Sequence, residues 1–177
     1  MIKKIFNLNK LQVYAISFMT SLFILFILLG YSFKLDAIKD EINIQKLSFF
    51  HVFFNNSKMV LLNIGLGGIT FSLYGVFTLF LNGIILGGVT KMLINVNLGI
   101  SVITGIIPHG IFEIPAIIIS SAISLIFYIG LFRTFRKFEN KIKFFKGFFK
   151  KNIINLIVLD FILLLIAAII ESTISFA

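Results

Sequence analysis

A histidine and a glutamate lie four residues apart in an otherwise apolar stretch, TGIIPHGIFEIPA, at residues 104–116. On a helix, His109 and Glu113 would lie one turn apart on the same face. Such a pair can bind or pass on a proton or an ion, and an ionisable residue inside a membrane is by default a functional hypothesis. The alternative role is structural, with the pair holding two helices together. We favour the structural role, because one histidine and one carboxylate do not form a recognisable catalytic set.

Two prolines in the same stretch bear on how these side chains are held. Pro108 is typical of the first turn of a helix, where its missing N–H leaves no hydrogen bond unmade. Pro115, seven residues later, removes a backbone donor from the early turns of that helix. Together with Gly110, the prolines predict a helix break. Because irregular backbone at membrane depth persists only inside protein or beside water, we expect this segment to lie in the protein interior or near the outer surface, and not against lipid.

Asp160 poses the same question in the last apolar run of the chain. Intramembrane charges usually pair with one another or with backbone groups, and His109 and Lys91 are the partners we expect for this carboxylate. Structural pairing is again favoured over a role in handling protons or solutes. His109, Glu113 and Asp160 are therefore predicted to form an intramembrane polar site.

Signatures of enzymes and metal sites are missing from the sequence. The chain has no cysteine, and its two histidines, His51 and His109, are far apart, so no H-E-x-x-H zinc motif exists. There is also no G-x-S-x-G nucleophile turn and no G-x-x-x-x-G-K-[ST] phosphate loop. We expect no catalytic residues, no metal and no cofactor.

The elements that position these residues are predicted to be membrane-spanning helices. Of 177 residues, 59% are hydrophobic and 13% charged, against about a quarter charged in soluble domains, and the mean hydropathy is +1.08. Because a helix needs about 20 apolar residues to cross a bilayer, we predict an all-α helical bundle forming a single membrane domain with about five spans. These are residues 11–33, 59–81, 92–112, 114–132 and 152–170.

Two connecting regions of this bundle are less regular. Residues 34–58 mix acids and bases and read as an external loop that ends in an interfacial helix. Glycines punctuate the long uncharged run from residue 59 to residue 90, and we place a turn or helix break near Asn82-Gly83. The segment around Pro108 either spans the membrane or is re-entrant.

Residues 133–151 carry most of the positive charge. Their aromatic and aliphatic side chains recur on one face of a helix, which predicts a basic amphipathic helix on the anionic inner leaflet rather than a nucleic-acid site. Eleven of the sixteen cations lie in this segment and at the N-terminus. The positive-inside rule therefore predicts a multi-pass protein of the cell membrane with a cytoplasmic N-terminus and an extracellular C-terminus. The eight cations of the segment are Arg133, Arg136, Lys137, Lys141, Lys143, Lys146, Lys150 and Lys151.

Small residues predict close helix packing. Gly83 and Gly87 form a G-x-x-x-G motif beside Asn82, which lets two helix backbones approach each other. This packing lies either within one subunit or between copies of the chain in a homo-oligomer.

The motifs FFHVFFNNSKMVLLNI, LNGIILGG and IIPHGIFEIPAI, followed by a basic loop and a last span, resemble the family of integral membrane proteins named after stage II sporulation protein M. The resemblance covers about His51 to Ile170 and is most specific in the P-H-G-x-x-E-x-P core. It implies a non-enzymatic membrane role as a scaffold or accessory subunit, with other membrane or envelope proteins as partners. In the sporulation protein the partners are peptidoglycan-degrading enzymes, whereas small members of about this length accompany circular-bacteriocin production. The alternative is a secondary transporter or export component in which Glu113 and Asp160 handle protons or a solute.

Overall fold

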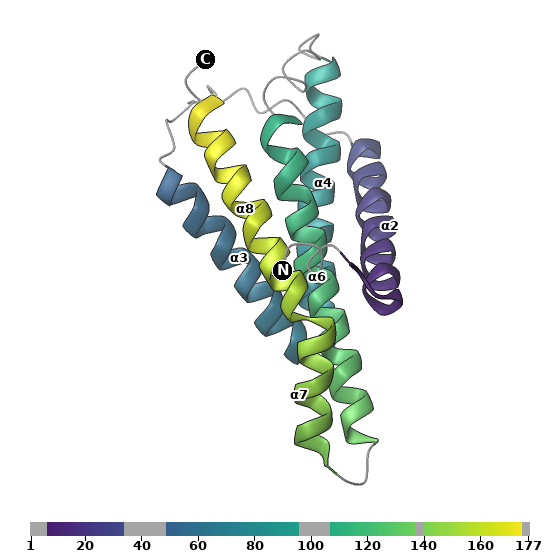
Figure 1. Ribbon diagram of the computed structural model, residues 1–177. Helices are drawn as coiled ribbons and strands as arrows, with labels where there is room; N and C mark the ends of the chain where they lie inside the picture. The colour runs from purple at the N-terminus through teal and green to yellow at the C-terminus, as the bar shows by residue number, and fades with distance from the viewer. Residues whose placement is uncertain (1–6, 34–48, 96–106, 137–139, 175–177) are drawn as a thin grey trace.

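The computed structural model describes residues 7–33, 49–95, 107–136 and 140–174. The regular elements of this part are helices, and they run side by side in an elongated bundle (Figure 1). The predicted all-α membrane bundle is therefore confirmed. The helices are α2 (Lys10–Ser32), α3 (Phe49–Ile69), α4 (Leu73–Asn95), α6 (Ile107–Phe135), α7 (Lys141–Asn152) and α8 (Ile154–Ile174).

α6 is the central helix of the bundle. It contacts α2, α3, α4, α7 and α8. In its most apolar stretch 61% of the residues are buried, against 22–33% in the corresponding stretches of α2, α4 and the α7–α8 segment. A side chain on α6 is thus held by the whole bundle, and this helix carries Glu113.

The chain reverses direction between α3 and α4 at residues 70–72, so the predicted span 59–81 is wrong. Phe71 and Ser72 adopt positive φ angles of 54° and 69°. The amide of Ser72 donates to the carbonyl of Gly67 at 2.7 Å, which closes the end of α3. The break expected near Asn82-Gly83 is also wrong, because α4 continues through both residues. Here the side chain of Asn82 donates to the Thr78 carbonyl at 2.8 Å, within its own helix.

The two spans predicted at 92–112 and 114–132 are replaced by a single helix. α4 ends at Asn95, residues 96–106 lie outside the described part, and α6 begins at Ile107. The helix start predicted near Pro108 is therefore confirmed. Pro115 lies inside α6 without ending it, so the break expected from Pro108, Gly110 and Pro115 is not seen. The surrounding helices hold α6 in shape although Pro115 donates no backbone hydrogen bond.

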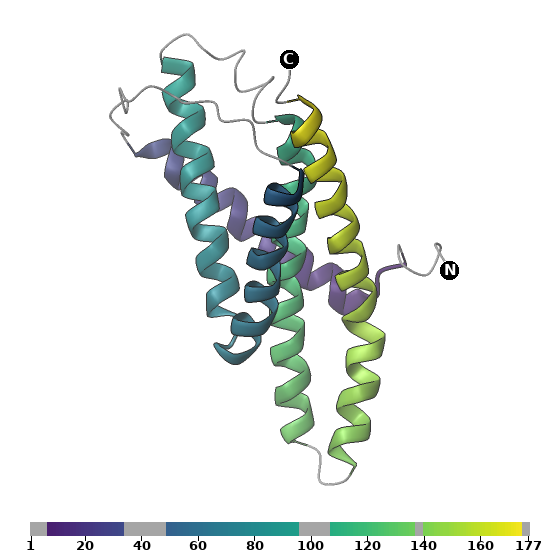
Figure 2. The same ribbon diagram turned by 90° about the vertical axis from the view of Figure 1, so that its left-hand side faces the viewer.

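Four described stretches are long and apolar enough to cross a membrane, namely Lys10–Ser32, Leu73–Asn95, Gly110–Phe135 and Lys141–Thr173. α2, α4 and α8 run in one direction, while α3 and α6 run in the other (Figures 1 and 2). α3 lies beside the four spans as a fifth, less apolar helix. Its first ten residues fall in the region expected to be the external loop, of which residues 34–48 are outside the described part.

Most of the basic segment forms the amphipathic helix α7. α7 leads directly into α8 and runs in about the same direction, so it does not lie across the end of the bundle (Figure 2). It packs against the last turns of α6 through aromatic rings. The ring of Phe127 meets those of Phe145 and Phe149 edge-on, at centroid distances of 5.5 and 6.4 Å. Gly130 lies against the ring of Phe148, where a Cβ atom would approach to 2.6 Å. The basic face of α7 therefore belongs to a helical hairpin with α6.

Candidate functional site

Glu113 lines a cavity of about 270 Å³ between α2, α4 and α6. Its side chain is half-buried, and Asn82 of α4 is the other polar side chain on the wall. The rest of the wall is apolar apart from the backbone at Gly110, and it consists of Phe23, Ile85, Leu86, Val89, Ile114 and Ile117. Glu113 thus lies at a cavity bounded by three helices.

The predicted partner of Glu113 begins the same helix. The backbone is helical over residues 107–113, so His109 precedes Glu113 by about one turn of α6. The side chains of Pro108 and His109 lie outside the described part of the chain. The His109–Glu113 pairing therefore stays a prediction.

Asp160 lies elsewhere, on the face of α8 that packs against α3 and α6. It is fully buried, and no described residue donates a hydrogen bond to either carboxylate oxygen. The expected pairing with Lys91 is not seen, because the Lys91 ammonium lies over the ring of Tyr31, 5.5 Å from its centroid. Glu113 lines the cavity between α2, α4 and α6, whereas Asp160 lies on the face of α8 that packs against α3 and α6. A common polar site of His109, Glu113 and Asp160 stays a prediction.

The level of Asp160 in the bundle follows from its neighbours. One turn along α8, Leu164 packs with Val60 of α3 and Ala116 of α6. Asp160 precedes Leu164 by about one turn of α8. Because α8 runs opposite to α3 and α6, Asp160 lies level with the residues one turn further along those two helices, Asn63 and Ser120. These last two are joined by a 2.9 Å hydrogen bond from Asn63 Nδ2 to Ser120 Oγ, whereas Asn63 Oδ1 has no described donor. Three buried acceptor oxygens therefore lie at this level without a donor.

Further along α6, two more serines contact the α3–α4 hairpin. Ser121 Oγ lies 3.2 Å from the Gly75 carbonyl, and Ser124 Oγ lies 2.9 Å from Ser72 Oγ in the turn. Gly67 and Gly75 leave room for Ser124, because a Cβ at either would approach this side chain within 3 Å. The closely spaced serines and glycines are the sequence signal for this contact, but their partners can be identified only in the folded chain.

The predicted packing glycines lie where α2 crosses α4. A Cβ atom on Gly83 would approach Phe26 Cβ to 2.6 Å, and one on Gly87 would overlap the Ile27 carbonyl oxygen. Gly30 of α2 faces the backbone of Ile84 in return. The small residues thus act here within one subunit, where they bring two helix backbones together.

A network of amide side chains, which the sequence analysis missed, ties the start of α2 to the α7–α8 junction. Asn9 and Gln12 form a reciprocal capping box at the N-terminus of α2. Gln12 Nε2 donates to the Asn152 carbonyl at 2.9 Å and lies 2.6 Å from Asn155 Oδ1. Asn9 Nδ2 donates to Asn152 Oδ1 at 3.0 Å. A buried glutamine in an otherwise apolar helix was the one sequence signal for this junction.

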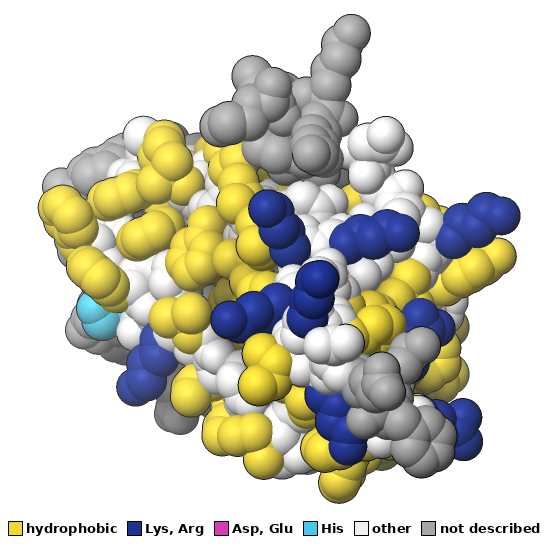
Figure 3. Space-filling model, turned by 60° about the horizontal axis from the view of Figure 1, so that its bottom comes forward, with side chains coloured by type: hydrophobic (Ala, Val, Ile, Leu, Met, Phe, Trp, Pro, Cys, Tyr) yellow, Lys and Arg dark blue, Asp and Glu magenta, His cyan; other side chains and the backbone are white. Residues whose placement is uncertain are grey.

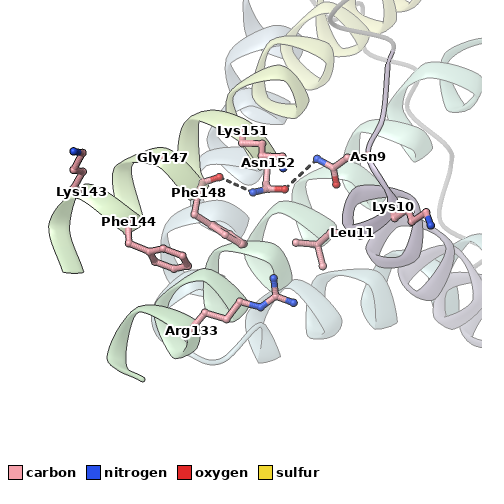
Figure 4. A pocket seen from close by; sticks show the side chains of 10 residues that line it. All are labelled: Asn9, Lys10, Leu11, Arg133, Lys143, Phe144, Gly147, Phe148, Lys151 and Asn152. Carbon is pink, nitrogen blue, oxygen red and sulfur yellow. Dashed lines mark hydrogen bonds between the residues drawn. The ribbon is translucent and has the colours of Figure 1, made fainter. Parts of the chain in front are cut away.

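Beside the network lies a larger, open pocket of about 650 Å³ (Figure 4). Four of its ten lining residues are cations, and none is acidic; the cations are Lys10 of α2, Arg133 of α6, and Lys143 and Lys151 of α7. Figure 3 shows Lys and Arg side chains gathered over this end of the molecule. Of the eight cations predicted to face the lipid, three line this pocket, and Lys137 lies outside the described residues. The other four do not line the pocket, and they are Arg136, Lys141, Lys146 and Lys150.

Comparison with known proteins places the chain in a family. No curated protein and no solved structure matches it. The family described as stage II sporulation protein M matches residues 9–176, nearly the whole sequence. The match includes every described helix and the P-H-G-x-x-E-x-P core at the start of α6. The chain therefore belongs to the stage II sporulation protein M family of membrane proteins.

Proposed function

We propose that the protein is a non-enzymatic scaffold or accessory subunit of a membrane complex. The observation that carries this proposal is how the buried polar side chains are used. Gln12 joins α2 to the α7–α8 junction, Asn63 joins α3 to α6, and Ser121 joins α6 to α4. Polar groups bonded in this way fix the relative positions of helices. A bundle fixed from inside can present constant outer faces to partner proteins.

Family membership supports two settings for such a scaffold. One is cell-envelope remodelling of the sporulation type, where the partners would be peptidoglycan-degrading enzymes. The other is export of, or immunity to, a peptide bacteriocin. The neighbouring genes discriminate between them: cell-wall hydrolases support the first setting, and an ATPase with a bacteriocin precursor supports the second.

The experiment is purification of the tagged full-length chain from its native membrane in a mild detergent. We expect a membrane or envelope protein to copurify in a constant ratio with the chain. The Glu113→Gln variant should retain that partner and reach the same membrane abundance, because a scaffold does not need the charge. Recovery of the chain alone, after crosslinking in intact cells as well, would contradict the scaffold.

A second candidate, a transporter or export component, is favoured by the oxygens around Asp160. The two oxygens of Asp160 and Oδ1 of Asn63 are buried acceptors at one level of the bundle, and no described group donates to them. A proton or a small cation is the kind of ligand that such acceptors bind. Asp160→Asn keeps the side-chain shape and removes the charge. Loss of flux at unchanged abundance would support transport, and an unchanged phenotype with an intact complex would support the scaffold.

A further inference from the structure

The pocket at the α2–α6–α7 end of the bundle concentrates positive charge that the scaffold role does not require. Its cations come from three helices, which the fold brings together from distant parts of the sequence. Arg133 points from α6 into the pocket, toward Leu11, while Lys10 and Lys143 lie at its two ends (Figure 4). None of the described residues that line the pocket carries a carboxylate to balance these cations. An anion is therefore the ligand that this lining favours.

The pocket is elongated along α7. Lys143 and Lys151 are eight residues apart, which corresponds to about 12 Å along a helix. A single bound chloride would leave most of that length unoccupied. Arg133 supplies planar paired donors suited to phosphate oxygens, and lysines at the ends add point charges. The length and the donor types fit a ligand that carries one or more phosphate groups.

The pocket wall is apolar next to the cations. Leu11, Phe144 and Phe148 line it, and the guanidinium of Arg133 lies 5.9 Å from the centroid of the Phe148 ring. The pocket also lies at the N-terminal end of the apolar helix α2, where the sequence predicts the cytoplasmic surface of the bilayer. A ligand with a phosphate head and an apolar body matches both parts of this wall.

We propose that this pocket binds the phosphate head group of an anionic phospholipid from the inner leaflet. The phosphate lies against Arg133 with Lys143 or Lys151, and the start of the acyl chains lies along Leu11 and Phe148. Basic pockets between membrane helices on the cytoplasmic side are suited to such head groups. The site is thereby distinct from the diffuse attraction of a basic helix for an anionic surface, since it depends on which cations line the pocket.

The chain offers a matched pair of variants for the test. The pocket variant is Arg133→Gln with Lys143→Gln and Lys151→Gln. The control variant is Arg136→Gln with Lys146→Gln and Lys150→Gln. Arg136 directly follows the last residue of α6, the two lysines lie on α7, and none of the three lines the pocket. Each variant removes three positive charges, so a diffuse electrostatic effect is equal in both.

The measurement is the unfolding temperature of the purified full-length chain in neutral detergent micelles. Phosphatidylglycerol, cardiolipin, phosphatidylcholine or inorganic phosphate is added in increasing amounts. A ligand that binds only the folded state raises this temperature. We expect both anionic lipids to raise it for the wild type and the control variant. The pocket variant should need about tenfold more lipid for the same rise, as expected for the loss of a charge-assisted phosphate contact.

A second variant tests the pocket without changing charge. Gly147 lines the pocket, and a Cβ atom there would meet no atom within 4 Å, so Gly147→Phe can extend into the open space. The control is Gly65→Phe on α3, where a Cβ atom also meets nothing within 4 Å. We expect Gly147→Phe, but not Gly65→Phe, to weaken the lipid-dependent rise.

Three results would overturn the proposal. An equal loss in the pocket and control variants would assign lipid binding to diffuse charge. An equal rise with phosphatidylcholine would show that the head-group phosphate of an anionic lipid is not selected. An equal rise with inorganic phosphate, lost in the pocket variant, would assign the site to a soluble phosphate compound and not to a lipid.

Discussion

Asp160 is fully buried, yet no described residue donates a hydrogen bond to its oxygens. A buried polar group without a partner lowers the stability of the fold by about 1–3 kcal/mol. At the residue scale, Asp160 is therefore a described side chain whose burial opposes the stability of the fold.

Replacing this carboxyl group should make the protein more stable. We expect Asp160→Leu to raise the free energy of unfolding by about 1–3 kcal/mol, because the unpaired oxygens are removed from the interior. The check is thermal unfolding in detergent, with Thr173→Leu as the control at an exposed site of the same helix. A clear loss of stability in Asp160→Leu would mean that the carboxyl group has a structural partner.

Gln12 is the opposite case, a buried polar side chain whose hydrogen bonds are all made within the described part of the chain. Gln12→Leu leaves the Asn152 carbonyl and Asn155 Oδ1 without this donor. We expect a loss of about 1–3 kcal/mol in unfolding free energy, because two acceptors remain at a buried junction. Ser21→Ala, which removes only an exposed hydrogen bond within α2, should leave the unfolding temperature unchanged. Equal stability of the two variants would contradict a structural role for the amide network.

At the scale of elements, α6 owes its shape to its neighbours. It passes through Pro115 without ending, and it binds the α3–α4 hairpin through serines whose partners lie on those helices. α2 and α4 instead meet through glycines, which bring their backbones into direct contact. The bundle thus combines a polar contact on one side of α6 with a contact of small residues between α2 and α4.

Alanine at two glycines should change stability with opposite signs. Gly65→Ala should stabilise the protein by about 1 kcal/mol, because alanine favours the helix and its methyl group meets open space. Gly87→Ala should destabilise it by about 1–3 kcal/mol, because the methyl group overlaps the backbone of Ile27. Unfolding temperatures of the two purified variants give the comparison. A stabilising effect at both positions would mean that α2 and α4 can move apart at little cost in free energy.

At the scale of the whole molecule, α2 and α8 point in the same direction, so the chain enters the bundle at one end and leaves it at the other (Figure 1). The cations of α7 and of the last turn of α6 gather at the entry end. By the positive-inside rule, this arrangement predicts that the basic end lies in the cytoplasm and that the two ends of the chain lie on opposite sides of the membrane.

Reporter fusions measure this topology. A phosphatase that is active only outside the cytoplasm should be active when fused after Ala177 and inactive when fused before Met1. The physical reason is the cluster of cations at the α7 end, which disfavours translocation of that end. Activity at both ends, or at neither, would contradict an odd number of crossings.

Several features could be predicted because they depend on local chemistry. The apolar runs at residues 11–33 and 152–170 correspond to α2 and most of α8, since hydropathy and length decide which segments can cross a bilayer. Pro108 marked the start of α6, because proline suits the first turn of a helix. The repeated aromatic residues of residues 133–151 marked the amphipathic helix α7. The sequence by itself therefore determined the class of the fold, the family and most of the helices.

Other features depend on groups that are distant in the chain. The turn at residues 70–72 uses positive φ angles at Phe71 and Ser72, which are not residue types that favour such angles. Ser72 is held there by Ser124 of α6. Glu113 and Asp160 look alike in the sequence, yet helix packing places one at a cavity and buries the other fully. The basic pocket exists only where α2, α6 and α7 meet. Tertiary structure decided these points, because turn position, pairing and pocket shape are set by contacts between helices.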